Sequence, residues 1–327
     1  IFIVYRGIQN GIEKWSKVLM PILFALLVVL IIRGLTLPGA MEGVRFYLSP
    51  DFSKITAKSF LAALGLAFFS LSLGMGVLIT YGSYLQRSAN LYRATLAVAG
   101  LDTLASLLAG LAIFPALFAM GFEPDLGPGL VFQVLPSVFA QMPLGPLWAT
   151  FFFLLILVAA LTSGISLLEV VTAYFIDEWR ISRKKATVVF GILIFFLGCL
   201  SAVSVAGWGR LEYVKKIILV LFDRVPDSFF DLMDNFASNW LLPLGGLMIS
   251  IFVGWIWGTR NAAEEIRQGA DEFTDIHIGN LLAGLKGFSE NNAEKPVMTL
   301  AVIWGIFIRF ITPIGVTVAF LNAVGLI

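Results

Sequence analysis

Long apolar runs separated by short polar segments dominate the chain. Seven runs are found, at residues 18–36, 59–85, 93–121, 146–176, 187–207, 235–258 and 298–325. Each is long enough to cross a hydrocarbon core about 30 Å thick, which takes roughly 20 helical residues. An alternating strand pattern of comparable length is absent from the sequence. We therefore predict an all-α polytopic membrane protein with about seven transmembrane helices.

The second run cannot be an ordinary helix. Its centre reads Phe68-Phe69-Ser70-Leu71-Ser72-Leu73-Gly74-Met75-Gly76. In a continuous helix, residues two positions apart point about 200° away from each other, so Ser70 and Ser72 could not serve one site. Unwound backbone at mid-membrane is tolerated only where it is buried in protein or lines a cavity, and secondary transporters bind ions and substrates at such breaks. We predict a broken helix here, with a binding site beside it.

Composition narrows the class of protein further. The 327 residues are 59% hydrophobic and 13% charged, with a formal net charge of +1. So little polar surface excludes a soluble globular domain, and the balanced charge gives no reason to expect a nucleic-acid partner. One cysteine and one histidine exclude an internal disulfide and a cysteine–histidine metal cluster. The lipid bilayer is the predicted environment.

The distribution of basic residues predicts the orientation. Lys and Arg cluster at the span ends that lie on one side of the membrane, and basic ends usually face the cytoplasm. We therefore predict a multi-pass protein of the cell membrane with residue 1 in the cytoplasm and residue 327 outside. The loop 122–145 has no basic residue and is interrupted by Pro and Gly, so we expect an extracellular, re-entrant-like loop of short helices. The loop 260–296 is then cytoplasmic. Segment 208–227 is basic on the external side, and its amphipathic pattern predicts an interfacial helix.

Asp102 is the single charged residue between Arg93 and Glu123. An isolated carboxylate inside a span is costly unless it meets a cation, a partner or water, so it is a functional candidate by default. Ser106 follows at i+4 on the same helix face. The alternative is a hydrogen bond that serves helix packing.

Oxygen-bearing residues also gather in the fourth run. Ala159, Thr162 and Ser163 fall at positions i, i+3 and i+4, and Leu167 continues the same face. Hydroxyls and helix carbonyls are hard oxygen ligands that suit a monovalent cation. Taken alone, this segment favours packing, because Ser and Thr commonly join helices in membranes.

Together these segments resemble the neurotransmitter:sodium symporter family, whose members share the LeuT-type inverted-repeat fold. The resemblance covers essentially the whole chain and is specific because several motifs follow in order. They are Arg6-Gly7-Ile8-Gln9-Asn10-Gly11-Ile12-Glu13, Phe69-Ser70-Leu71-Ser72-Leu73-Gly74-Met75-Gly76, Ile79-Thr80-Tyr81-Gly82-Ser83-Tyr84, Gly100-Leu101-Asp102-Thr103, Leu161-Thr162-Ser163-Gly164 and Arg309-Phe310-Ile311-Thr312-Pro313. They match helices five to eleven of the family, so we read residues 1–327 as one transmembrane region of a bacterial-like member without the first four helices.

The resemblance implies symport of sodium with a small amino acid by alternating access. It implies one sodium ion at Ser70 and Asp102, and a second at the Ala159 carbonyl, Thr162 and Ser163. The implied substrate pocket is formed by Phe69, Ser70, Ser72, Met75, Ser163 and Leu167. Asp234 is the implied acidic half of an extracellular gate, and Asp177 with Tyr84 part of an intracellular gate.

Three departures from the family sharpen the prediction. Many relatives have asparagine at Asp102, and chloride-dependent relatives hold the anion with a serine that matches Ser106 and a glutamine where this chain has Leu66. A carboxylate at Asp102 supplies the negative charge itself, so we expect that chloride is not required. Met75 replaces a phenylalanine of some relatives, and its flexible thioether predicts a pocket for hydrophobic or aromatic amino acids.

Two other readings stay open. The chain could belong to a transporter of the same architecture for another small solute, coupled to protons or sodium, with Asp102 as a proton relay. It could also be a non-transporting membrane module. An enzyme is not expected, because the sequence offers no nucleophile–base pair, metal cluster or phosphate-binding loop.

Overall fold

The computed structural model describes residues 1–122, 129–205, 228–270, 273, 300–324 and 326. By their internal contacts these residues form two compact units. Unit 1 comprises Ile1–Ile55 and Gly100–Ile192, and unit 2 comprises Thr56–Ala99 and Leu193–Ile327.

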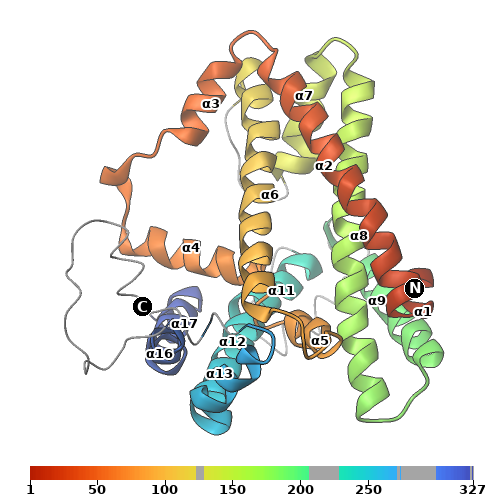
Figure 1. Ribbon diagram of the computed structural model, residues 1–327. Helices are drawn as coiled ribbons and strands as arrows, with labels where there is room; N and C mark the ends of the chain where they lie inside the picture. Colours follow the sequence, from red (N-terminus) through yellow and green to blue (C-terminus); the bar gives the residue numbers. More distant parts are fainter. Residues whose placement is uncertain (123–128, 206–227, 271–272, 274–299, 325, 327) are drawn as a thin grey trace. The chain divides into compact units, whose positions relative to one another are not determined.

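Every regular element in the described residues is helical (Figure 1). In chain order they are α1 Phe2–Tyr5, η1 Ile8–Glu13, α2 Lys14–Leu35, α3 Ala40–Leu48, η2 Phe52–Lys54, α4 Ala57–Ser70, α5 Val77–Ser83, α6 Leu91–Ala119, η3 Leu130–Val134, α7 Leu135–Gln141, α8 Gly145–Asp177, α9 Arg183–Val205, α11 Phe229–Asn235, η5 Phe236–Leu241, α12 Leu242–Ile251, η6 Phe252–Gly258, α13 Thr259–Arg267, α16 Leu300–Ile306, η7 Phe307–Ile311 and α17 Thr312–Ala323. The elements η1, η3, η5, η6 and η7 are π-helical, and η2 is a 3₁₀ turn.

The predicted spans are confirmed. Within the described ranges, six helical stretches are long and apolar enough to cross a membrane: Ile8–Leu35, Leu91–Ala119, Gly145–Asp177, Arg183–Val205, Phe229–Arg267 and Leu300–Ala323. The remaining run, residues 59–85, is the one predicted to break, and it forms two shorter helices, α4 and α5. The protein is therefore an all-α, multi-pass membrane protein.

Unit 1 has its core where α2, α6, α7 and α8 meet. Helices α2 and α8 lie side by side (Figure 1). The buried side chains of this core include Leu27, Leu117, Val138 and Phe152. Close packing of these side chains holds the long helices together around one apolar centre, so α8 has one face fixed in the core and another face available for chemistry.

The short helix α3 is fixed against α6 in unit 1. The Tyr47 ring covers Gly110, where a Cβ would collide with it. Its hydroxyl donates to the carbonyl oxygen of Ser106 over 3.4 Å, and burial raises the pKa of the Tyr47 phenol. This contact fixes the part of α6 that carries Asp102.

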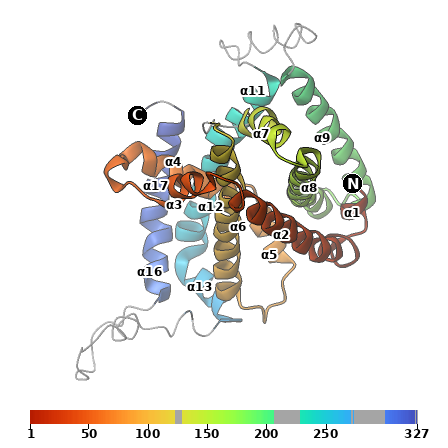
Figure 2. The same cartoon turned by 90° about the horizontal axis from the view of Figure 1, so that it is seen from above.

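Unit 2 is organised around α4, α12 and α17, which lie together in both views (Figure 2). Leu242 and Val316 are buried between them. The first helix of this group ends at Ser70, where the predicted site begins.

Several predicted segments are described only in part. Residues 130–141 form η3 and α7, short helices within the predicted loop 122–145, and their extracellular placement stays a prediction. The predicted interfacial segment 208–227 lies outside the described residues. In the predicted cytoplasmic loop, α13 is helical, while 271–272 and 274–299 also lie outside them.

Candidate functional site

The helix break forms at the predicted residues. Helix α4 ends at Ser70, and α5 begins at Val77. Ser72, Gly74 and Gly76 have φ angles of 54°, 84° and 78°. These left-handed conformations suit glycine and are strained for serine, so Ser72 is held in a conformation that an L residue rarely adopts.

The backbone of the break satisfies many of its own hydrogen bonds. The amide of Leu73 donates to the carbonyl of Phe68 over 2.9 Å, and the amide of Ser72 donates to that of Phe69 over 3.1 Å. Together these two bonds, from Leu73 to Phe68 and from Ser72 to Phe69, form the Schellman motif that commonly ends a helix. The unwound segment is thus a defined turn.

Close packing on α12 fixes the position of this turn. A Cβ at Gly74 would lie 2.9 Å from the Gly246 nitrogen and closer still to the Leu242 carbonyl oxygen. A Cβ at Gly246 would in turn collide with the ring of Phe68. Glycine on both sides lets the two backbones approach, which a side chain would prevent.

A cavity of about 200 Å³ opens beside the break within unit 2. Its wall combines apolar side chains with three hydroxyl residues: Ser72 of the break, Ser250 of α12 and Thr312 of α17. A second cavity of about 260 Å³ lies along α4 and α12 and is lined by Phe69 and Asn239. Ser72 and Phe69 therefore line different cavities of unit 2, and Met75 is among the described lining residues of neither.

Asp102 and Ser106 both lie in the part of α6 that belongs to unit 1. The Asp102 side chain is partly buried, and Ser106 is exposed. Their four-residue spacing on a continuous helix puts a carboxylate and a hydroxyl one turn apart, as predicted.

The oxygen-rich patch of α8 is assembled locally. The hydroxyl of Thr162 donates to the Ala159 carbonyl oxygen over 2.8 Å, and the hydroxyl of Ser166 donates to the Thr162 carbonyl over 3.2 Å. Ser163 and Leu167 are exposed on the same helix. The first hydrogen bond brings two of the predicted sodium ligands into contact, and the hydroxyl oxygen keeps lone pairs for a cation.

The predicted gate residues lie at helix ends. Asp234 is exposed near the end of α11 and accepts a hydrogen bond from Ser238 over 3.1 Å. Asp177 is the last residue of α8, and Tyr84 follows α5, with its ring 6.4 Å from that of Tyr81.

The structure groups the candidate residues within each unit. Unit 1 holds Asp102, Ser106, Ala159, Thr162, Ser163, Leu167 and Asp177, and unit 2 holds Phe69, Ser70, Ser72, Met75, Tyr84 and Asp234. Ala159 and Thr162 are in direct contact. The pairings that join residues of different units, such as Ser70 with Asp102, stay predictions.

One buried ion pair was missed by the sequence reading. Glu169 of α8 is fully buried and accepts two hydrogen bonds from Arg183 of α9, of 2.7 and 2.9 Å. The signal was available, since a carboxylate inside a span is a functional candidate for the same reason as Asp102. The partner could not be predicted from the sequence, because Arg183 lies fourteen residues further along and meets Glu169 only when α9 packs against α8.

The comparisons with known proteins agree with these features. A profile described as the sodium:neurotransmitter symporter family matches residues 1–274. The chain belongs to this family. The family assignment made from the motifs is thus confirmed.

The similar proteins of this family are longer than the chain. The uncharacterized sodium-dependent transporter YhdH of Bacillus subtilis is 39% identical over 327 residues, which are 100% of this chain and 65% of YhdH. An uncharacterized sodium-dependent transporter of Haemophilus influenzae is 44% identical over 255 residues, which are 78% of this chain and 53% of that protein. The chain therefore spans between about half and two thirds of these relatives.

A similar solved structure supports the fold. The crystal structure of MhsT in complex with L-phenylalanine is 42% identical in sequence, with a TM-score of 0.76, and the match covers 98% of this chain and 65% of MhsT. The LeuT-type fold predicted from the motifs is confirmed by this similarity. The relatives from Bacillus subtilis and Haemophilus influenzae are described as sodium-dependent transporters, and the family is one of symporters and not of enzymes.

Proposed function

We propose that the protein containing this chain couples sodium entry to the uptake of a small hydrophobic or aromatic amino acid by alternating access. The observation that carries the proposal is the helix break at Ser70–Gly76, which is packed against α12 through glycines and bordered by a cavity. Breaks of this kind present backbone carbonyls, amides and short hydroxyl side chains at membrane depth.

The proposed sodium ligands are all hard oxygen donors. Ser70 and Asp102 would form one site, and the Ala159 carbonyl, Thr162 and Ser163 the other. The contact between Thr162 and Ala159 supports the second site, because it leaves two oxygen atoms already side by side. The negative charge of Asp102 would compensate a cation in a region of low dielectric constant.

The proposed substrate class is supported by one similar structure and by the chemistry of Met75. MhsT, at 42% identity, was solved in complex with L-phenylalanine. In the proposed pocket, the flexible thioether of Met75 would adapt to a bulky apolar side chain, and Phe69, Ser70, Ser72, Ser163 and Leu167 would complete the lining. Asp234 on one side, and Asp177 with Tyr84 on the other, are the proposed gate residues.

Uptake by the full-length protein in proteoliposomes tests the proposal. We expect an inward sodium gradient to drive accumulation of labelled L-phenylalanine, with unlabelled leucine and tryptophan competing. Uptake that persists when choline replaces sodium and a pH gradient is kept would favour the proton-coupled alternative. Clear preference for glycine or alanine would refute the substrate class.

A hydroxyl deletion tests the second sodium site. Thr162→Ala removes one ligand, and we expect the sodium concentration for half-maximal uptake to rise at least tenfold, which corresponds to about 1.4 kcal/mol of lost binding free energy. Thr150→Ala is the matched control, since Thr150 of the same helix donates to the Pro146 carbonyl over 2.7 Å. An equal effect of both variants would show that packing, not sodium binding, is what Thr162 provides.

Anion replacement tests the proposed independence from chloride. Since Asp102 carries its own negative charge, exchanging external and internal chloride for gluconate should leave sodium-driven uptake unchanged. A loss of uptake in gluconate that chloride restores would instead assign an anion site to Ser106.

A further inference from the structure

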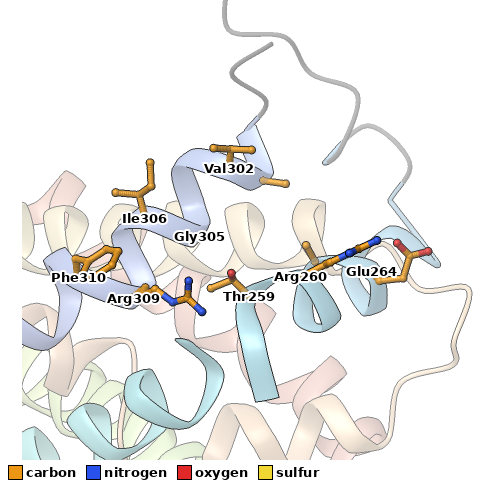
Figure 3. Close-up of a pocket in the computed structure, with 10 residues that line it drawn as sticks. Thr259, Arg260, Glu264, Val302, Gly305, Ile306, Arg309 and Phe310 are labelled. Carbon is orange, nitrogen blue, oxygen red and sulfur yellow. The ribbon is translucent and has the colours of Figure 1, made fainter. Parts of the chain in front are cut away.

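A basic cleft lies at one end of the last two described spans of unit 2 and has a lining different from that of the cavity beside the helix break. The cleft encloses about 390 Å³ between α13 and α16–η7. Its polar lining consists of Thr259, Arg260, Glu264 and Arg309, and its apolar wall includes Val302, Ile306 and Phe310 (Figure 3).

Reciprocal hydrogen bonds hold Arg309 at the floor of the cleft. Its Nε donates to the Gly254 carbonyl over 2.9 Å, and the indole of Trp255 donates to the Arg309 carbonyl over 3.1 Å. The guanidinium carbon also lies 5.2 Å from the centre of the Trp255 ring. These contacts use one nitrogen of the guanidinium, and the two terminal nitrogens have no hydrogen-bond partner among the described residues. The cation is therefore positioned and still able to donate.

The depth of the cleft corresponds to the boundary between hydrocarbon and water. The apolar span leads through the exposed Trp255 and Trp257 to Gly258, after which α13 is strongly polar. Tryptophan is enriched where the headgroups lie. Thr259 lies against Gly305 and Gly254 against Arg309, so Arg309 sits about one helical turn deeper than Thr259. Helical side chains lean toward the N-terminus, which here directs Arg309 back toward Thr259, as Figure 3 shows.

The charges favour an anion. Arg260 and Arg309 are two cations, whereas Glu264 is the single acidic residue of the described lining. Glu264 is also 3.9 Å from Arg267, which offsets its charge. In Figure 3, Arg260 extends alongside Glu264 and Arg309 lies on the other side of Thr259, so the two arginines border the cleft at separate points.

We infer that this cleft binds the headgroup of an anionic phospholipid from the adjoining leaflet, which the orientation of the basic loops predicts to be the cytoplasmic one. The phosphate meets Arg309 and the Thr259 hydroxyl, Arg260 adds attraction at the rim, and an acyl chain covers the exposed Val302, Ile306 and Phe310. Basic pockets between spans are the usual sites for such headgroups. A free phosphate ion would use the same cations and would leave the apolar wall uncovered.

Lipid titration of the purified, delipidated full-length protein tests the inference. Native mass spectrometry would compare phosphatidylglycerol with phosphatidylcholine of the same acyl chains. We expect the wild type to retain phosphatidylglycerol preferentially. Arg260→Gln should weaken that binding about fivefold, because each arginine near the membrane surface contributes about 1 kcal/mol. Val302→Asp should weaken the binding as well, because it places a negative charge on the apolar wall, where it repels the anionic lipid and disfavours the acyl chain.

Controls separate the cleft from general basic attraction. Arg87→Gln removes an exposed arginine of the same unit outside the cleft and should bind phosphatidylglycerol like the wild type. Arg309→Gln is expected to abolish the preference; if it does not fold, Arg260→Gln and Val302→Asp decide. Wild-type binding by both of these variants would overturn the inference. Displacement of phosphatidylglycerol by excess inorganic phosphate would also overturn it, in favour of a free anion.

Discussion

At the scale of single residues, burial decides how much a charge contributes. The ion pair of Glu169 and Arg183 joins α8 to α9 with a fully buried carboxylate, whereas Glu13 and Lys17 form a shorter contact of 2.6 Å at the surface. Removing a partner from a buried pair leaves an uncompensated charge, whereas an exposed pair is solvated in either case. Distance alone would rank these two pairs in the wrong order.

Glu169→Gln should therefore destabilise unit 1. It removes the negative charge from the buried pair with Arg183, and we expect the free energy of unfolding to fall by about 3 kcal/mol, the lower end of values for broken buried pairs because the Arg183 side chain is partly exposed. Thermal denaturation in mild detergent would measure the change, with Glu13→Gln as the control expected to show no measurable shift. A double-mutant cycle with Arg183→Met isolates the pair, and equal melting temperatures of Glu169→Gln and wild type would contradict the prediction.

At the scale of elements, the sequence predicted the spans and the break well. Runs of apolar residues are read reliably by length, and the glycines around Met75 indicated where α4 had to end. The partner of the break could not be predicted, because Gly245 and Gly246 of α12 look like ordinary glycines until the structure places them against Gly74. The separate cavities of Ser72 and Phe69 were equally hidden, since they depend on how α12 and α17 pack against α4.

Gly74→Ala tests the packing between the break and α12. The new Cβ would meet backbone atoms of α12 and occupy a left-handed conformation, so we expect a loss of about 1–3 kcal/mol in stability together with reduced uptake. Gly65→Ala is the matched control, because nothing lies within 4 Å of a Cβ there and alanine favours helix α4. Its stability should stay unchanged or rise by up to about 1 kcal/mol. Similar losses in both variants would argue against a specific contact at the break.

At the scale of the whole molecule, the chain supplies a large part of the transport machinery proposed here. It spans 65% of YhdH and of MhsT. The candidate sodium and substrate residues are distributed over both of its units. Binding of a sodium ion or a substrate between such groups would act on the stability of the complete protein, not on one helix.

Ligand-dependent stabilisation of the full-length protein is the corresponding prediction. Sodium at about 100 times its dissociation constant should raise the free energy of unfolding by about 2.7 kcal/mol for each site occupied. The melting temperature should therefore rise in sodium relative to equal potassium or choline, and rise again when L-phenylalanine is added. An unchanged melting temperature in all three salts, with and without the amino acid, would favour a non-transporting module.

The hydrogen bonds that close the turn after α4 have a consequence for the free energy of ligand binding. Because Leu73 and Ser72 donate to carbonyls at the end of α4 and the glycines fix the turn on α12, the segment does not have to unwind when a ligand arrives. The cost of opening the helix is already met in folding, so the site is preorganised and binding free energy is not consumed in building it. Amide hydrogen exchange at 71–76 should accordingly be nearly the same with and without sodium, while ligand-induced protection should appear in the residues that close around the site.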